Sequence, residues 1–574
     1  MLSTNDLLKA PCFARHICKN CEQQFKITDA DLAFYEKVSP QFNGKKYLIA
    51  PPTLCPECRR QRKLAWRNER ILYQRSCDLC SKKIVSVHAP DHPYPVYCNA
   101  CWWGDKWNPL SFGITYDASR PFFEQYLDLF SRVPQRAMVN DDGVMSENCA
   151  YTFDVAFSKN CYLCFGMWKA QDCYYCRICD QSKFCVDCEG VKLGSELVYE
   201  SVDSQRLYRS AFMQNSENCS DCFFGFDLKG CTDCIACGGL RQKRFYILNK
   251  PYSEEEYRKR LAEFRLTSRS GLKSLQSQFD ILIRSITRKN MNLQNCEECL
   301  GDHLFNCRKV LGYVTTNAEY SKWIDRSDGP IWSYDQIQSG SPQLCYECIT
   351  VDNGYMNCFC LYCNQSHYAI YSDNCLHSEN LLGCISLRRK KYCILNVQYT
   401  KEEYEKLAEL IVENMKREGT FGEFFPISFS PYGYNETNAA ESFPLSEEEV
   451  KRRGWKWRQD LPYTIGKETL TSSALPDNIQ DVSDSIIHEI LACTGCKRNY
   501  TIIQKELDFY HNLNLPIPEY CPNCRNQHRL KRRNPQQLWK RPCMKCNKEM
   551  DTTYSPRPGG EIVYCEKCYL KAIY

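Results

Sequence analysis

Sixteen of the chain's 41 cysteines stand in eight C-x-x-C pairs, four near each end. The two-residue spacer lets a tight turn point both sulfurs at one metal ion, and a second pair after a loop completes a tetrahedron of thiolates. We therefore expect about four Zn²⁺ ions, and we expect them to be structural, because four thiolates leave no position for water or a substrate. The predicted ligands are Cys18, Cys21, Cys55, Cys58, Cys77, Cys80, Cys98, Cys101, Cys493, Cys496, Cys521, Cys524, Cys543, Cys546, Cys565 and Cys568.

The grouping of these pairs into sites is open from sequence alone. Sequential grouping joins the first pair with the second and the third with the fourth, whereas a cross-braced arrangement would use the same residues. Disulfides are the less favoured interpretation. No run of 18 apolar residues exists and the first residues, MLSTNDLLKAPCF, lack the features of a signal peptide, so we expect a cytoplasmic protein without membrane contact, in which thiols stay reduced. Buried free thiols are a further alternative.

The two ends are copies of one module. All four cysteine pairs recur in the same order, and the residues between them match as well. "DLAFY" at 31–35 returns as "ELDFY" at 506–510, and "CPECRRQRK" at 55–63 returns as "CPNCRNQHR" at 521–529. The sequence therefore predicts a double zinc-ribbon module over residues 1–110 and a second over 488–574.

Each copy resembles the bacterial family described as a probable zinc-ribbon domain, from Cys18 to Arg67 and again from Cys493 to Arg533. The whole arrangement, paired ribbons around a cysteine-rich middle, resembles uncharacterised bacterial multi-zinc-ribbon proteins. This resemblance implies zinc on the matching cysteines. It implies no established activity.

A basic helix is predicted after the second cysteine pair of each module, because helix formers dominate there and Gly and Pro are absent. Its basic residues recur at i, i+4 and i+8 and so share one face. We expect this face to contact phosphate groups of RNA or DNA, with Trp66 and Trp539 nearby to stack on bases, although a solvated helix face is the plainer alternative. The predicted nucleic-acid contacts are Arg59, Lys63, Arg67, Arg525, Arg529 and Arg533.

Another 24 cysteines lie in the middle of the chain and follow a different pattern. Residues 148–195 and 218–241 divide into rows of twelve, each with Cys second, and five of the six rows begin with Asn, Asp or Gly. This period predicts β-helix-like solenoid coils with a corner before each inward-pointing Cys. Two C-x-x-C-x-x-C triplets, Cys173/Cys176/Cys179 and Cys231/Cys234/Cys237, leave an iron–sulfur cluster or further zinc as alternatives.

The expected fold class is mainly β with helices, with duplicated zinc-ribbon modules that flank β-helix-like solenoid repeats and their capping helices. Capping boxes at Ser253/Glu256 and Thr400/Glu403 start a helix where each solenoid ends. The predicted segments between the modules are a helical connector over 111–147, solenoid 1 over 148–245, capping helices over 246–294, solenoid 2 over 295–393, a capping helix over 394–417, and a linker with a short helix over 418–487.

Charge is distributed unevenly along the chain. Residues 1–110 carry 17 Lys and Arg against 10 Asp and Glu, and residues 488–574 carry 15 against 8, although the whole chain is only +5. We therefore expect a non-enzymatic zinc-binding adaptor or scaffold whose basic ends bind nucleic acid and whose solenoid binds a protein partner. The alternatives are a scaffold that binds proteins only and a redox or metal-cluster protein that uses the central cysteines. No motif indicates an enzyme or a small-molecule substrate.

Overall fold

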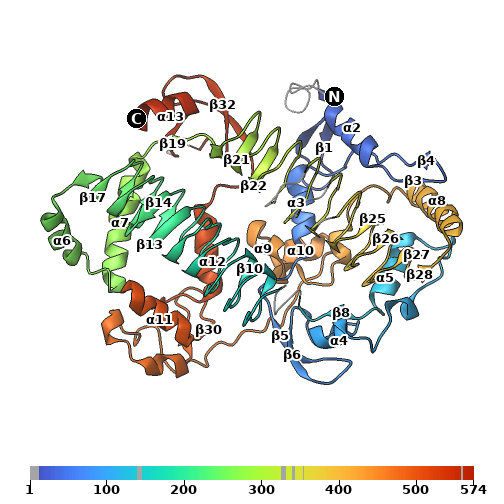
Figure 1. Cartoon of the computed structure of the whole chain (residues 1–574), viewed down its shortest axis with the longest axis horizontal. Helices are drawn as coiled ribbons and strands as arrows, with labels where there is room; N and C mark the ends of the chain where they lie inside the picture. The colour runs from blue at the N-terminus through green and yellow to red at the C-terminus, as the bar shows by residue number, and fades with distance from the viewer. Residues whose placement is uncertain are drawn as a thin grey trace. The chain divides into compact units, whose positions relative to one another are not determined.

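A computed structural model describes residues 12–138, 145–324, 327, 331–338, 340, 343–352, 354–557 and 560–573. The chain forms two compact units, each made of two separate stretches: unit 1 is Met1–Ala137 with Met291–Leu461, and unit 2 is Met138–Asn290 with Pro462–Tyr574. Unit 1 thus combines the N-terminal module with the second cysteine-rich segment, and unit 2 combines the C-terminal module with the first (Figure 1). Helices account for 25% of the described residues and strands for 28%. The fold is therefore a mixture of helix and strand, whereas the sequence led us to expect mainly β with helices.

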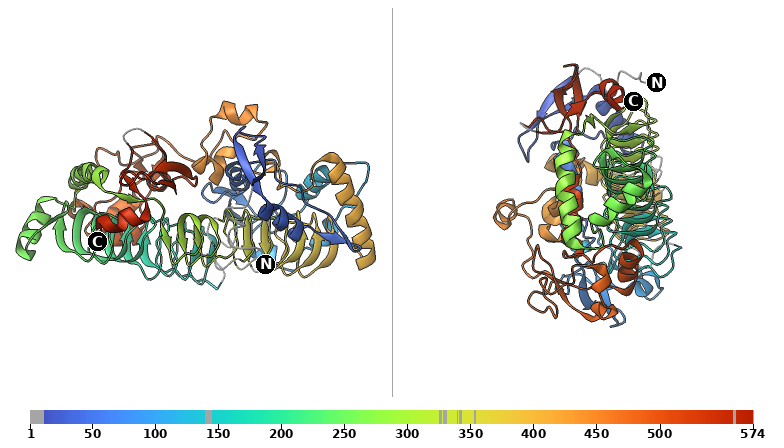
Figure 2. Two further views of the ribbon diagram at one scale, coloured as in Figure 1. Left: turned by 90° about the horizontal axis from the view of Figure 1, so that it is seen from above. Right: turned by 90° about the vertical axis from the view of Figure 1, so that its left-hand side faces the viewer.

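The first cysteine-rich segment, in unit 2, winds into stacked coils whose short strands pair in parallel (Figure 2). Phe153 pairs with Phe165 and Glu196 with Tyr208, an offset of twelve residues that equals the sequence period. One coil is longer, since Lys183 pairs with Glu196. The strands are β9 (Phe153–Ala156), β10 (Phe165–Trp168), β11 (Lys183–Val186), β12 (Glu196–Tyr199), β13 (Gln205–Gln214), β14 (Glu217–Ser220), β15 (Phe223–Phe226), β16 (Thr232–Gly238), β17 (Arg244–Ile247) and β18 (Lys250–Pro251).

We expected one corner per coil, before its cysteine, but each coil has several corners. In the first coil, φ is positive at every third residue, with values of 52°, 55°, 56° and 53° at Asn148, Tyr151, Asp154 and Phe157. The residue after each of these is buried. A twelve-residue coil is therefore built from four three-residue sides, and the left-handed backbone at each corner turns the next side chain inward.

Cysteine and serine suit this narrow interior because they bond to the backbone that surrounds them. The Sγ of Cys164 donates to the carbonyl of Cys173 at 3.2 Å, and the Sγ of Cys176 donates to that of Cys185 at 3.2 Å. The Oγ of Ser158 accepts from the amide of Ala170 at 3.1 Å. Small side chains that satisfy buried backbone groups thus account for the abundance of thiols here.

The second cysteine-rich segment, in unit 1, forms similar coils. Leu300 pairs with Leu311 at an offset of eleven residues, and His367 pairs with Glu379 at an offset of twelve. The strands are β20 (Leu293–Gln294), β21 (Leu300–Phe305), β22 (Leu311–Thr316), β23 (Thr350–Asp352), β24 (Tyr362–Asn364), β25 (His367–Ile370), β26 (Glu379–Leu382), β27 (Lys391–Ile394) and β28 (Val397–Gln398).

The two stacks end alike. β17 and β27 each turn back in an antiparallel hairpin, with β18 and β28, before a helix begins at the expected capping box. These helices are α6 (Glu254–Glu263), followed by α7 (Arg269–Ser285), and α8 (Lys401–Glu418). The ring centroids of Tyr257 in α6 and Phe245 are 5.4 Å apart, and those of Tyr404 in α8 and Tyr392 are 5.8 Å apart. Each helix therefore packs on the last coil.

The remaining elements form the two modules and the connectors. The segment 418–487, where a linker with a short helix was expected, contains α10, whose N-cap is Ser446. None of the helices in the described residues combines the length and apolar character needed to cross a membrane. These elements are β1 (Cys12–Ile17), β2 (Gln24–Thr28), α2 (Asp29–Val38), β3 (Gln41–Phe42), β4 (Lys45–Lys46), α3 (Pro56–Leu64), β5 (Tyr73–Ser76), β6 (Lys83–Ser86), β7 (Val96–Tyr97), α4 (Asn99–Trp103), α5 (Phe122–Phe130), β8 (Gln135–Arg136), β19 (Arg288–Lys289), α9 (Asn438–Ser442), α10 (Glu447–Arg452), β29 (Leu491–Ala492), β30 (Asn499–Tyr500), α11 (Gln504–Leu513), α12 (Pro522–Arg532), β31 (Trp539–Pro542), β32 (Glu549–Thr552), β33 (Val563–Tyr564) and α13 (Glu566–Ile573).

Candidate metal centres

The first cysteine tetrad of unit 1 joins a strand hairpin to a helix. Cys18 and Cys21 lie in the turn between β1 and β2, and Cys55 and Cys58 lie at the start of α3. The Sγ atoms of Cys21 and Cys55 are 3.7 Å apart, and the amide of Cys55 donates to the Sγ of Cys18 at 3.3 Å. All four sulfurs lie within 4.8 Å of one another, which places them to hold one metal ion.

The other three tetrads repeat this construction. The second lies between the β5–β6 turn and α4, the third between the β29–β30 turn and α12, and the fourth between the β31–β32 turn and α13. One sulfur–sulfur distance in each is 3.9 Å, 3.6 Å and 3.8 Å, respectively. Their members are Cys77, Cys80, Cys98 and Cys101; Cys493, Cys496, Cys521 and Cys524; and Cys543, Cys546, Cys565 and Cys568. The pairs therefore group sequentially, in agreement with the simpler of the two expectations.

Local sequence explains why both halves of a tetrad converge. In each hairpin a residue with positive φ closes the turn after the second cysteine: Glu22, Ser81, Lys497 and Asn547 have φ of 60°, 61°, 63° and 57°. The second cysteine pair begins a helix, where unpaired backbone amides and the helix dipole favour a thiolate. Pro56 and Pro522, at the first helical position, lack an amide hydrogen that would have no acceptor there.

One thiol of each tetrad is biased toward the thiolate that a metal ion requires. In the first tetrad, a hydrogen bond from Cys58 lowers the pKa of Cys55 to about 5, which outweighs burial. In the fourth, burial raises the pKa of Cys543, but hydrogen bonds from the backbone of Cys565 and Cys546 bring it to about 6. Cys77 and Cys493 likewise reach a pKa of about 7, because backbone hydrogen bonds outweigh burial.

The central cysteines are arranged differently. Among the described residues, only the four terminal tetrads bring three or more metal-ligand atoms within 4.8 Å of one another. The two triplets that suggested a cluster, beginning at Cys173 and Cys231, are buried in the coils, and their sulfurs bond to backbone carbonyls. The described coils therefore contain no further site of this kind.

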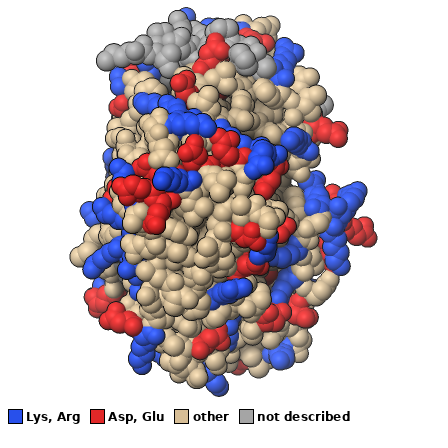
Figure 3. All heavy atoms as spheres, turned by 90° about the vertical axis from the view of Figure 1, so that its right-hand side faces the viewer, with Lys and Arg blue, Asp and Glu red and all other residues tan. Residues whose placement is uncertain are grey.

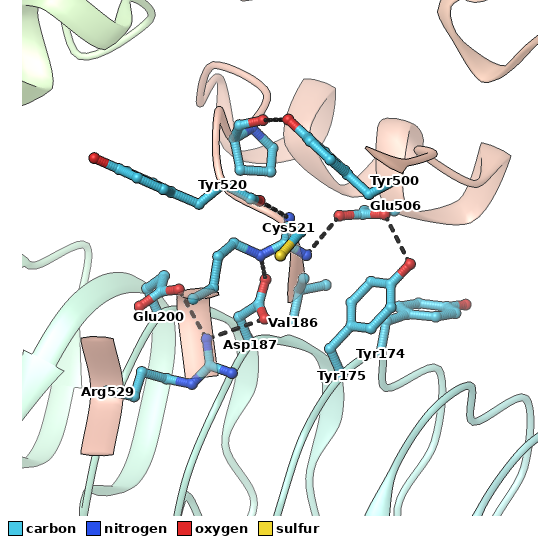
Figure 4. A network of polar contacts seen from close by, with 12 residues as sticks. Tyr174, Tyr175, Val186, Asp187, Glu200, Tyr500, Glu506, Tyr520, Cys521 and Arg529 are labelled. Atoms are coloured by element: carbon cyan, nitrogen blue, oxygen red, sulfur yellow. Dashed lines mark hydrogen bonds and ion pairs between the residues drawn. The ribbon is translucent and has the colours of Figure 1, made fainter. Parts of the chain in front are cut away.

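The helix that carries half of the third tetrad is fixed to the coils of unit 2 by buried ion pairs (Figure 4). The Nε of Arg525 lies 2.7 Å from Asp187, and Nη1 of Arg529 lies 3.0 Å from Asp187 and 2.8 Å from Glu200. Glu506 of α11 accepts from Arg525 at 3.1 Å. Burial raises the pKa of the Asp187 carboxyl to about 7 although both arginines lower it, so the pairing offsets a substantial desolvation cost.

Unit 1 contains the equivalent contact. Arg59 of α3 lies 2.9 Å from Asp335, and Lys63 lies 3.5 Å from the same carboxylate. Arg62 lies 2.7 Å from Glu347, one coil further on. Arg59 and Lys63 align with Arg525 and Arg529, so the duplication extends to the contact between module and coils.

The structure thus places the six predicted nucleic-acid contacts against the chain's own residues. Arg59, Lys63, Arg67, Arg525 and Arg529 are each no more than 3% exposed. Arg67 donates to Gln338 at 2.6 Å, and Arg533, which is half-buried, pairs with Glu189 at 3.0 Å and Asp203 at 2.9 Å. Trp66 is buried against Phe424 and Phe425, whereas Trp539 of β31 is partly exposed. The expected accessible basic stripe is absent from these described residues because carboxylates cover it.

Sequence reasoning missed the acidic partners Asp187, Glu200, Asp335 and Glu347. A signal for them existed in the charge pattern, since residues 111–487, between the basic ends, carry 42 Lys and Arg against 51 Asp and Glu. Asp187 and Asp335 both stand at coil corners with positive φ, where Asp is well tolerated. A carboxylate at a coil corner can therefore form an ion pair with a basic helix that packs beside that corner.

The chain matches no protein-family model, no curated protein and no solved structure. The resemblance to zinc-ribbon domains therefore depends on the cysteine spacing together with the geometry of the four tetrads.

Proposed function

We propose that the protein is a non-enzymatic scaffold in which four structural Zn²⁺ ions, one per tetrad, hold zinc-ribbon modules against β-helix-like solenoids. Four thiolates within 4.8 Å suit a tetrahedral Zn²⁺ site. Such a site has no open position, so bound zinc would supply folding free energy and not Lewis-acid chemistry.

The observation that carries this proposal is the burial of the basic helix faces. Asp187 binds two arginines of α12, and Asp335 binds Arg59 and Lys63 of α3, so the tetrad and the coil contact share one helix in each unit. Loss of the metal would free the start of the helix and thereby weaken the contact. Zinc thus acts as a staple between each module and its solenoid.

The solenoids offer repetitive outer surfaces to a protein partner. On the face seen in Figure 3, Lys and Arg side chains are interspersed with Asp and Glu, and no single sign of charge covers it. This face is the side on which α8 and β28 lie in Figure 1, and its mixed charge fits specific protein contact better than long-range attraction of a polyanion. Nucleic-acid binding through the six basic residues stays a prediction, and it requires the ion pairs to open.

Hydrogen exchange of the full chain, with and without a zinc chelator, tests the staple. We expect chelation to speed exchange of the α12 amides, while those of β15 and β16, deep in the stack, stay protected. Readded Zn²⁺ should restore protection of α12. If α12 stays protected after all zinc has been removed, the tetrad does not hold the helix on the coils and the proposal fails.

A further inference from the structure

A cluster of tryptophan and arginine side chains lies beside the second tetrad of unit 1. Trp102 and Trp103 end α4, with their rings 5.0 Å apart in an edge-to-face arrangement. Trp102 is only 1% exposed, whereas Trp103 is 51% exposed. The chain thus presents a large aromatic surface to solvent immediately after Cys101, on a helix that the tetrad anchors.

Arg388, from the coil that precedes β27, reaches the same indoles. Its guanidinium carbon lies 4.1 Å from the ring centroid of Trp102, 5.0 Å from that of Trp103 and 5.4 Å from that of Trp107. A second guanidinium, that of Arg136, lies 5.0 Å and 5.9 Å from the centroids of Trp102 and Trp103. Two cations therefore converge on one aromatic pair.

Arg388 contacts aromatic rings and a backbone carbonyl, whereas Arg59 of α3 and Arg525 of α12 pair with carboxylates. Its guanidinium donates to the carbonyl oxygen of Trp102, and its Nε is buried with no hydrogen-bond partner among the described residues. Burial lowers the pKa of Arg388, and the nearby charge of Asp105 acts against this without a direct ion pair. The positive charge of Arg388 is thus not neutralised by a direct carboxylate partner among the described residues.

Two further exposed basic residues, Arg389 and Lys106, are close in sequence to Arg388 and Trp103. Arg389 follows Arg388 at a coil corner with φ of 52° and is exposed, and Lys106 is exposed three residues after Trp103. Lys391 is paired with Glu379 at 2.7 Å. Arg388, Arg389 and Lys106 have no carboxylate partner within ion-pair distance in the described part of the chain. The exposed Asp105 lies near Arg388 without a direct ion pair, so these charges are not neutralised in the way that those of α3 are.

We propose that this surface binds single-stranded nucleic acid, with a base stacked on Trp103 and adjacent phosphates on Arg388, Arg389 and Lys106. Unpaired bases stack on aromatic rings, and arginine contacts both phosphate oxygens and ring faces. An acidic peptide would use the charges but not the exposed indole, so the combination favours nucleic acid. The inference goes beyond the scaffold and does not depend on it, since none of these side chains takes part in the module–coil ion pairs.

Fluorescence anisotropy with labelled oligouridylate and oligothymidylate of about twelve nucleotides, on the zinc-loaded full chain, tests this surface. We expect Trp103→Ala to weaken binding by about five-fold or more, the loss of one stacked base. Arg388→Gln and Arg389→Gln should each weaken binding and reduce the dependence of log K on log salt by about 0.7. The matched controls are Trp168→Ala, an indole 37% exposed in unit 2, and Arg265→Gln, an exposed arginine there.

The outcomes separate clearly. Affinity for either oligonucleotide that depends on Trp103 supports the proposal, and a preference for oligouridylate or oligothymidylate identifies RNA or DNA as the source. No binding at about 0.15 M salt overturns it. Equal binding of polyglutamate, or affinity unchanged in Trp103→Ala, also overturns it and indicates a plain polyanion or acidic-peptide site. Metal content and circular dichroism check folding, and the exposed Trp103 and Arg389 keep the test decisive if Arg388→Gln fails to fold.

Discussion

Asp187 meets Arg525 at 2.7 Å with both side chains almost completely buried, and Asp335 meets Arg59 in the same way at 2.9 Å. Arg525 and Arg59 are equivalent residues of the duplicated module. At these contacts the basic ends of the chain pair with carboxylates from its own acidic middle. The uneven distribution of charge along the sequence is thus explained here by ion pairs within the chain.

The first prediction concerns this contact. Asp187→Asn keeps the size of the side chain but leaves Arg525 and Arg529 buried without its charge, so we expect unit 2 to lose about 3 kcal/mol of unfolding free energy. Urea unfolding, followed by hydrogen exchange of α12, measures the loss. Glu147→Ala, which removes an exposed pair with Lys159, is the matched control and should leave the stability unchanged. A loss no larger than that of the control would contradict the role given to Asp187.

The second prediction separates the two kinds of cysteine. Cys521→Ser removes a ligand of the third tetrad, so bound metal should fall by one equivalent per chain. Cys176→Ser should leave the metal content unchanged and the coils folded, because serine already stands at inward positions such as Ser158 and Ser182, where its hydroxyl bonds to the backbone. Metal analysis together with circular dichroism distinguishes these results. Metal loss from Cys176→Ser would mean that the central thiols are ligands.

The third prediction concerns two neighbouring histidines of unit 1, the buried His88 and the half-buried His92. The His88 ring stacks on the Tyr432 ring with 5.5 Å between the ring centroids, and the His92 ring stacks on the Tyr94 ring with 5.0 Å between them. Burial lowers the pKa of His92 to about 4 and that of His88 well below its usual value, and the charge of Arg75 adds to both effects. The folded state therefore binds fewer protons than the unfolded state below pH 6.5, so stability present above that pH is lost as the pH falls toward 4.

Urea unfolding in excess zinc at pH 7 and pH 5 measures this dependence. For His92 alone the expected loss is about 1–2 kcal/mol, and His92→Gln should remove that part of the difference between the two pH values. His511→Gln, an exposed histidine of unit 2, is the control. An equal pH dependence in wild type and His92→Gln would contradict the assignment.

Local patterns in the sequence predicted the parts of the structure that local patterns determine. The C-x-x-C spacing located the tetrads, because a two-residue turn is sufficient to bring two sulfurs together. The twelve-residue period likewise equals the offset between paired strands in the first cysteine-rich segment. The four corners of each coil were not predicted, because left-handed residues such as Tyr151 and Leu163 carry no turn signal in their side chains.

The contacts between distant segments could not be predicted in the same way. A basic face at i, i+4 and i+8 has the same sequence pattern whether it meets a phosphate or a carboxylate. The choice between them depends on Asp335 lying beside Arg59, 276 residues away along the chain. That proximity arises from the fold of unit 1, and nothing within the helix itself encodes it.

Elemental analysis of the full chain, purified anaerobically without added metal, tests the central claim most directly. The account predicts about four zinc ions per chain and no iron, one ion for each tetrad. Substantial iron, or clearly more metal than the four tetrads can hold, would show that the central cysteines are ligands. Either result would contradict the assignment of their thiols to the hydrogen-bonded core of the coils.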